Sequence, residues 1–128
     1  MPDDRAIRLR KAIEDSLDEM AVQLAGGIGP QFLELIKIYQ RLVALQEFKV
    51  LLPQYGAADP AIDAGYDLMK STFESMRSKL SEAERKIFED EMKRIQVEKS
   101  VPQAVRNGFG QVFGAAPAAK KGCFFSFF

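Results

Sequence analysis

The sequence predicts an all-α protein: a bundle of three to four helices followed by an extended C-terminal tail. Two observations predict it. Apolar residues recur at helical spacings of three and four, and glycine or proline separates most of these periodic segments. The composition is globular, with 47% hydrophobic and 28% charged residues in a chain of 128. We therefore expect a helical bundle over residues 1–100 and a basic tail, rich in Gly, Ala and Phe, over residues 101–128.

The first predicted helix begins at Asp3 and Asp4, whose carboxylates suit the positive end of a helix dipole and can accept free amide hydrogens. Apolar residues then follow at spacings of three and four, on one stripe of a helix: Ala6, Leu9, Ile13, Leu17, Met20 and Leu24. We expect this helix to end at Gly26 and Gly27, because glycine adopts the left-handed C-terminal turn at little cost.

A second helix is predicted from Pro30 to the residue before Pro53. Proline suits the first helical position, and it disfavours helical geometry in the residue that precedes it. Apolar residues cover almost the whole circumference of this helix, which is typical of a helix central to a core or shared between two interfaces. The apolar alternation over residues 48–52 leaves a short strand as an alternative for the last turn.

A third helix is predicted from the cap Asp59 and from Pro60. Its apolar residues form a heptad seam, as in a coiled coil: Ile62, Tyr66, Met69, Phe73, Met76 and Leu80. A capping box over residues 81–84 then predicts a fourth helix that ends near Ser100, before Pro102. The residues expected to face inward from it are Ile87, Phe88, Met92 and Ile95. Because no glycine or proline separates these two segments, a single bent helix over residues 60–99 is the alternative.

The composition changes after residue 99. A short amphipathic helix over residues 102–113 is an alternative to a fully extended tail, although two glycines weaken it. Residues 100–128 contain three bases and no acid, so this segment carries a charge of +3 and leaves −3 on the body of a chain that is neutral overall. Four phenylalanines stand among the last five residues, and exposed apolar clusters of this kind drive association. We interpret the following residues as the docking residues of the tail: Phe109, Phe113, Cys123, Phe124, Phe125, Phe127 and Phe128.

The phenylalanine cluster needs a surface to bury against. Burying four phenylalanines stabilises by roughly 6–12 kcal/mol at most, while ordering about ten residues costs about 1–2 kcal/mol each. Three surfaces are candidates: the chain's own bundle, another protein chain, and a membrane. A membrane surface would be contacted by Lys120 and Lys121, since lysines near anionic lipid contribute ~1 kcal/mol each.

The composition excludes several kinds of chemistry. The chain has no histidine and one cysteine, which rules out zinc sites built on Cys and His, an internal disulfide, and Ser–His or Cys–His catalytic pairs. Residues 26–30 are rich in glycine but lack the Lys-Ser/Thr of a phosphate-binding loop. We therefore expect no enzyme, no metal and no cofactor. The polar N-terminus and the lone cysteine predict a cytoplasmic protein, with a membrane surface or a larger assembly as alternative locations.

Four bases lie close together in the first helix: Arg5, Arg8, Arg10 and Lys11. Such a patch can contact phosphates. Four acids follow directly within residues 14–19, however, and this segregation favours charge registry against an antiparallel neighbour. A solvated surface and nucleic-acid binding are the alternatives, and the second is the least favoured.

Taken together, these features predict a non-enzymatic helical module for protein–protein interaction or assembly: a structural subunit, an assembly factor or an adaptor. Its aromatic tail is expected to dock on copies of the chain or on a partner protein. The alternative is a peripheral membrane protein anchored by the Lys-Lys-Gly-Cys-Phe-Phe segment over residues 120–125. Nucleic-acid binding through the basic N-terminal helix is a minor alternative.

Overall fold

The structure, a computed structural model, describes residues 4–114, and every regular element in that range is helical. The α-helices are α1 (Asp4–Ile28), α2 (Leu33–Gln54), α3 (Ala61–Ser78), α4 (Glu82–Arg94) and α5 (Val97–Phe113), and a 3-10 turn over Pro30–Phe32 precedes α2. The predicted all-α bundle is confirmed. The predicted count of three to four helices is wrong, because the described chain forms five α-helices.

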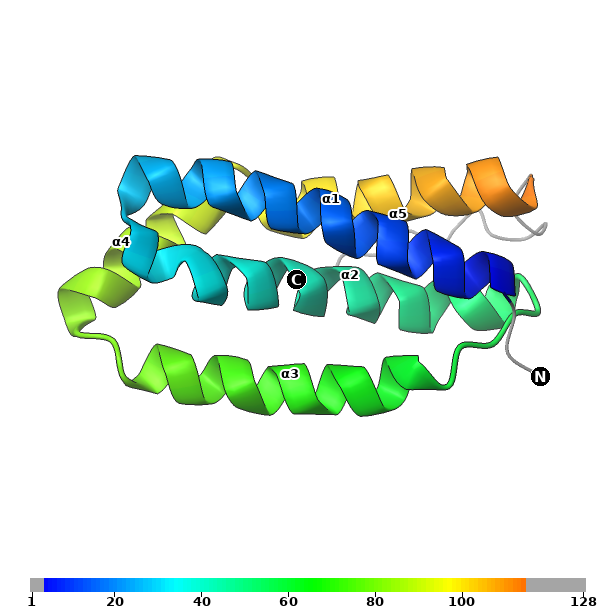
Figure 1. Cartoon of the computed structure of the whole chain (residues 1–128), viewed down its shortest axis with the longest axis horizontal. Coiled ribbons are helices and arrows are strands. Elements are labelled where there is room, and N and C mark those ends of the chain that lie inside the picture. The colour runs from blue at the N-terminus through cyan, green and yellow to red at the C-terminus, as the bar shows by residue number, and fades with distance from the viewer. Residues whose placement is uncertain (1–3, 115–128) are drawn as a thin grey trace.

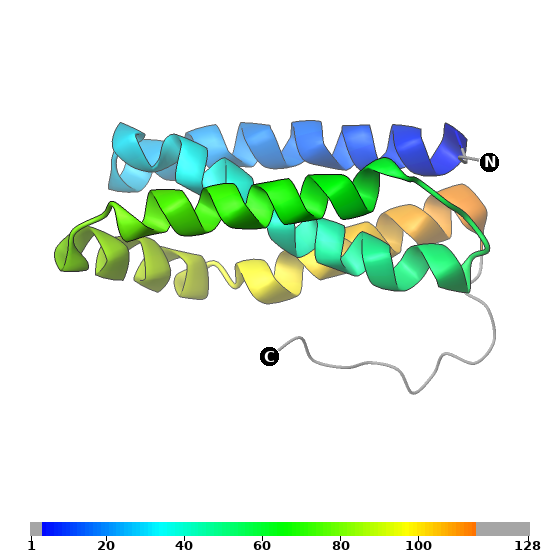
Figure 2. The same ribbon diagram turned by 90° about the horizontal axis from the view of Figure 1, so that it is seen from below.

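The helices form three layers with α2 in the middle. Figure 1 shows α1 and α5 side by side on one face of α2 and α3 on the opposite face. Helix α4 crosses one end of the bundle between α3 and α5, and Figure 2 gives the same arrangement from below, with α3 in front. Helix α2 contacts α1, α3 and α5, so its nearly continuous apolar circumference is explained by its central position.

The core lies mainly where α2 faces α1 and α5. Four phenylalanines are among its largest fully buried side chains: Phe32, Phe48, Phe88 and Phe109. The ring of Phe109 lies 5.2 Å from that of Phe48 and 5.1 Å from that of Tyr55, measured between centroids. Helix α5 is therefore an integral part of the bundle.

The expected end of the last helix near Ser100 is wrong. Helix α4 ends at Arg94, and Gln96 then adopts a left-handed conformation (φ 54°, ψ 49°) from which α5 starts. Helix α5 runs through Pro102 to Phe113, so residue 100 lies inside a packed helix, and this helix includes the alternative helix over residues 102–113. Pro102 is buried close to the start of α5, where its missing N–H interrupts a single helical hydrogen bond.

Two other helix ends differ from expectation. Gly26 and Gly27 lie inside α1, and the chain reverses at Gly29, whose φ of 137° is strained for any residue with a side chain. Pro53 lies in the last turn of α2, so this helix ends two residues later than predicted, and the alternative of a short strand there is wrong. A proline in the last turn removes one hydrogen bond without stopping the helix.

The break between α3 and α4 follows the predicted capping box. Ser81 Oγ accepts a hydrogen bond from the Glu84 amide at 3.1 Å, and Glu84 Oε1 accepts one from the Ser81 amide at 3.0 Å. The alternative of one bent helix over residues 60–99 is therefore wrong. Of the residues expected to face inward from α4, Phe88 and Met92 are buried, whereas Ile87 is 46% exposed.

Candidate functional site

Helix α3 is the helix least buried in the bundle. It packs on α2, and Ile62 is its one buried residue within 61–78. The rest of its predicted seam lies against the core but keeps partial exposure: Tyr66, Met69, Phe73, Met76 and Leu80. This arrangement leaves apolar surface open along the line where α3 approaches α2, α4 and the start of α5.

The open surface forms a groove, called here the α3 groove. It consists of two adjoining hollows of about 490 and 390 Å³ that share four lining residues: Tyr39, Phe73, Arg77 and Glu98. The larger hollow continues along α4 past Phe88 and Met92, and the smaller one continues along α2 past Leu42 and Val43. Both volumes fall in the range of about 300–1,000 Å³ that is typical of ligand pockets.

Three aromatic rings from three helices line the bottom of the α3 groove. Tyr39 of α2 stacks on Phe73 of α3 with centroids 5.4 Å apart and meets Phe88 of α4 edge-on at 5.6 Å. Phe73 and Phe88 are 6.1 Å apart. Such contacts stabilise by about 0.5–1.5 kcal/mol beyond the burial of area, so this cluster holds α3 and α4 against α2 while leaving part of its surface exposed.

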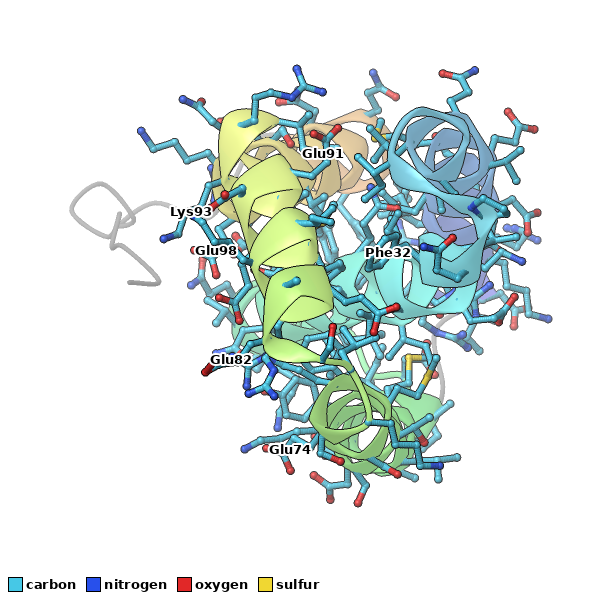
Figure 3. All side chains as sticks on the ribbon, turned by 90° about the vertical axis from the view of Figure 1, so that its left-hand side faces the viewer. Phe32, Glu74, Glu82, Glu91, Lys93 and Glu98 are labelled. Carbon is cyan, nitrogen blue, oxygen red and sulfur yellow. The ribbon has the colours of Figure 1, made fainter. Side chains whose placement is uncertain are left out.

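Charged residues of both signs border the rings. The bases are Lys70, Arg77, Lys93 and Lys99, and the acids are Glu74, Glu89 and Glu98. Arg77 of α3 forms an ion pair with Glu89 of α4. Figure 3 shows Glu74, Lys93 and Glu98 on the same side of the bundle, with the buried Phe32 on the other side of α4.

Tyr39 connects the aromatic rings to this charged border. Its hydroxyl donates a hydrogen bond to Glu98 Oε2 at 2.7 Å. Burial raises the pKa of Tyr39, and the hydrogen bond and negative charge of Glu98 raise it further. The phenol therefore stays protonated at physiological pH and acts as a hydrogen-bond donor. The α3 groove thus combines an apolar aromatic surface with a polar edge, as is typical of sites that bind apolar anchors.

A second polar feature lies inside the bundle and is not predicted by the sequence analysis. Glu47 of α2 is 1% exposed and accepts a hydrogen bond from Arg106 Nη1 of α5 at 3.1 Å. Within residues 4–114, no group donates a hydrogen bond to Oε1 of Glu47 or to Oε1 of the buried Gln40. Burial raises the pKa of Glu47, although Arg106 partly opposes the shift. The sequence signal for this pair is the position of Glu47 within α2, the helix that is apolar around almost its whole circumference.

Two residues of the predicted docking set lie in the bundle. Phe109 is 0% exposed. Phe113 stacks on Phe109 with centroids 5.4 Å apart, at the end of α5, and the guanidinium of Arg5 lies 4.5 Å above its ring. The remaining predicted residues lie outside the described range: Lys120, Lys121, Cys123, Phe124, Phe125, Phe127 and Phe128.

The four predicted bases of α1 lie in different surroundings. Arg10 Nε donates to Asp59 Oδ2 at 2.6 Å, and its Nη1 lies 3.4 Å from Glu14 Oε1. Arg5 lies over the ring of Phe113, while Arg8 and Lys11 are exposed. Further along α1, Asp18 pairs with Arg41 of α2 at 2.6 Å. A base near the start of α1 and an acid near its middle thus each pair with an opposite charge elsewhere in the same chain.

Among residues 4–114, no cluster of three or more acids, cysteines or histidines is placed to hold a metal ion. Within the same range, no helix has the length and apolar character needed to cross a membrane. No protein-family model, curated protein or solved structure matches the chain. A functional assignment therefore rests on the α3 groove and on the sequence itself.

Proposed function

We propose that the chain is a non-enzymatic protein–protein interaction module whose α3 groove receives an aromatic segment. The observation that supports this proposal is the aromatic cluster in which the partly exposed rings of Tyr39 and Phe73 pack on the buried Phe88, bordered by charges of both signs. The phenylalanine-rich segment over residues 124–128 is an anchor of the matching chemistry. We propose that this segment binds the α3 groove of another copy of the chain, or a partner protein in an assembly.

A small number of aromatic contacts would supply most of the free energy with which the segment binds the α3 groove. Aromatic side chains that enter well-packed pockets dominate the binding energy of protein interfaces, and the polar border excludes water and sets the register. Each phenylalanine buried in the α3 groove contributes on the order of 1.5–3 kcal/mol. Two anchors are therefore enough to offset part of the cost of ordering the segment and to give a reversible interaction.

Peptide binding tests the proposal. The receptor is the full chain in which Phe124, Phe125, Phe127 and Phe128 are replaced by serine, so that its own anchors are absent. The probe is a fluorescein-labelled peptide of residues 115–128, followed by fluorescence anisotropy. We expect saturable binding that is at least tenfold weaker when the receptor also carries Phe73→Ala, because the stacking surface is lost.

The matched control is Leu68→Ala on the same helix. Leu68 is 69% exposed and lies outside the α3 groove, so its removal should leave the affinity unchanged. Circular dichroism confirms that all three receptors are equally helical. Absence of binding, or equal binding to all three receptors, contradicts the proposal.

Attachment to a membrane surface is the second candidate function, and a sequence observation favours it. Lys120 and Lys121 directly precede Cys123 and the phenylalanines, which is the pairing of bases and aromatic residues suited to an anionic interface. Flotation with phosphatidylserine vesicles separates the two candidates. Membrane attachment requires that the full chain floats with the vesicles and that the variant with four serines does not.

A further inference from the structure

We propose that in the free chain residues 124–128 occupy the α3 groove of the same chain. The groove is then closed by an internal competitor, and a copy or partner must displace this segment to bind. This inference rests on the proposed function of the α3 groove as a site for aromatic anchors, and it adds the regulation of that site.

The first argument is reach. Glu98 and Lys99 line the α3 groove at the start of α5, and Gly114 follows the last residue of that helix. Sixteen residues of helix separate Glu98 from Gly114, which places the end of α5 about 24 Å from the groove at ~1.5 Å per residue. Ten further residues lead from Gly114 to Phe124, and they span up to about 33 Å when extended. The connection is long enough to return along α5.

The second argument is the direction of the chain at the end of α5. Gly114 has a φ of 88° and a ψ of −156°, a conformation that residues with a side chain rarely adopt. The helix therefore stops at this residue, and the chain that follows is not committed to the direction of the α5 axis. A return toward the α3 groove requires this change of direction.

The third argument is charge. Residues 100–128 contain no acid, and Lys120 and Lys121 stand just before the phenylalanines. The α3 groove is bordered by the exposed acids Glu74 and Glu98. When the phenylalanines contact the aromatic rings, the two lysines lie within a few residues of these carboxylates. Four bases border the groove as well, so the two lysines gain a favourable contact only where they reach Glu74 or Glu98.

Tethering decides between the chain's own tail and the tail of a second copy. A short connection gives the attached segment an effective concentration on the order of millimolar. A second copy at micromolar concentration offers the same segment at roughly one-thousandth of that value. The same contacts therefore favour closure within one chain, and exchange between chains requires high concentration or extra contacts from the partner.

The sole cysteine of the chain allows a direct test. A nitroxide attached to Cys123 stands next to Phe124, and its effect on ¹⁵N-labelled amides of the full chain is measured by NMR. We expect strong broadening at residues 70–77 and 96–99, which border the α3 groove, and none at Ser16 and Gln23 on the exposed face of α1. Replacing Phe124, Phe125, Phe127 and Phe128 with serine should abolish the broadening.

A mixed sample distinguishes occupancy of the groove by the same chain from occupancy by a second copy. When spin-labelled ¹⁴N chain is combined with unlabelled ¹⁵N chain, we expect no broadening of the groove residues at 100 μM or below. Broadening in the mixed sample as strong as in the single sample overturns the inference in favour of a second copy. Absence of groove broadening from both samples overturns it as well.

Failure of this inference is distinguishable from failure of the proposed function. If the peptide of residues 115–128 binds the serine variant but the nitroxide does not broaden the groove, the site exists and the internal closure does not. If the peptide does not bind, the site itself is wrong. If the groove binds the segment and the chain's own segment also occupies it, the peptide must compete with that segment. The peptide then binds wild-type chain at least tenfold more weakly than it binds the serine variant.

Discussion

Gly108 lies where α5 packs closely against α1. A Cβ atom at this position would lie 2.8 Å from Leu9 Cδ1 and 3.5 Å from Ile13 Cδ1. Gly110, two residues later on the same helix, has no atom within 4 Å of such a Cβ. The two glycines therefore have the same helix propensity but different surroundings, and this makes them a matched pair for the packing of α1 on α5.

We predict that Gly110→Ala raises the free energy of unfolding by up to about 1 kcal/mol, because alanine is the better helix former. Gly108→Ala should give a smaller gain or a loss, since the Leu9 side chain must move away from the new methyl group. Urea unfolding followed by circular dichroism measures both. An equal or larger gain for Gly108→Ala would show that α5 does not pack on α1 as described.

The carboxylate of Glu47 is buried, and burying this negative charge lowers the free energy of unfolding. Because burial raises its pKa above that of an unfolded glutamate, the folded chain binds its proton more tightly than the unfolded chain does. The free energy of unfolding therefore falls as the pH rises above about 4.3. Arg106, whose side chain is 43% exposed, reduces this cost without removing it.

We predict that the stability of the wild-type chain declines relative to that of Glu47→Gln as the pH rises from 4 to 7. The glutamine variant lacks the titrating group, so the difference between the two unfolding free energies isolates it. Urea unfolding at several pH values measures the trend. A difference that is independent of pH, or that grows in favour of the wild-type chain, contradicts the shift.

At the scale of the elements, local signals with a known mechanism predict the structure well. The capping box at Ser81 separates α3 from α4, and the seam that includes Phe73 faces the core. The break at Gln96 could not be predicted, because glutamine has no preference for the left-handed conformation that it adopts there. Packing of Val97, Val101 and Val105 in the core holds α5 in place beyond that break.

The capping box gives a prediction at this scale. Ser81→Ala should lower the free energy of unfolding by about 1 kcal/mol, because the Glu84 amide loses its acceptor. Ser71→Ala, at an exposed position within α3, should change it by less than about 0.5 kcal/mol. Thermal or urea unfolding measures both variants, and equal effects would mean that the cap does not stabilise the start of α4.

At the scale of the whole molecule, the α3 groove results from contacts that no local pattern specifies. Tyr39, Phe73 and Phe88 come from three helices and meet through the crossing of α4 over the end of the bundle. The sequence places Phe73 on the seam of the third predicted helix and Phe88 on the inward face of the fourth, and both pack in or against the core. The surplus of apolar residues indicated an interaction surface, but its location depends on long-range packing.

The central claim is that in the free chain the α3 groove holds the phenylalanine-rich segment of the same chain, and amide hydrogen exchange of the full chain tests it most directly. Two proteins are compared: the wild-type chain and the variant in which Phe124, Phe125, Phe127 and Phe128 are serine. Amides of α3 and of residues 96–99 should exchange faster in the variant, because the segment no longer covers them, while α1, which does not line the groove, stays equally protected. Identical exchange of the two proteins throughout residues 61–99 would contradict the account.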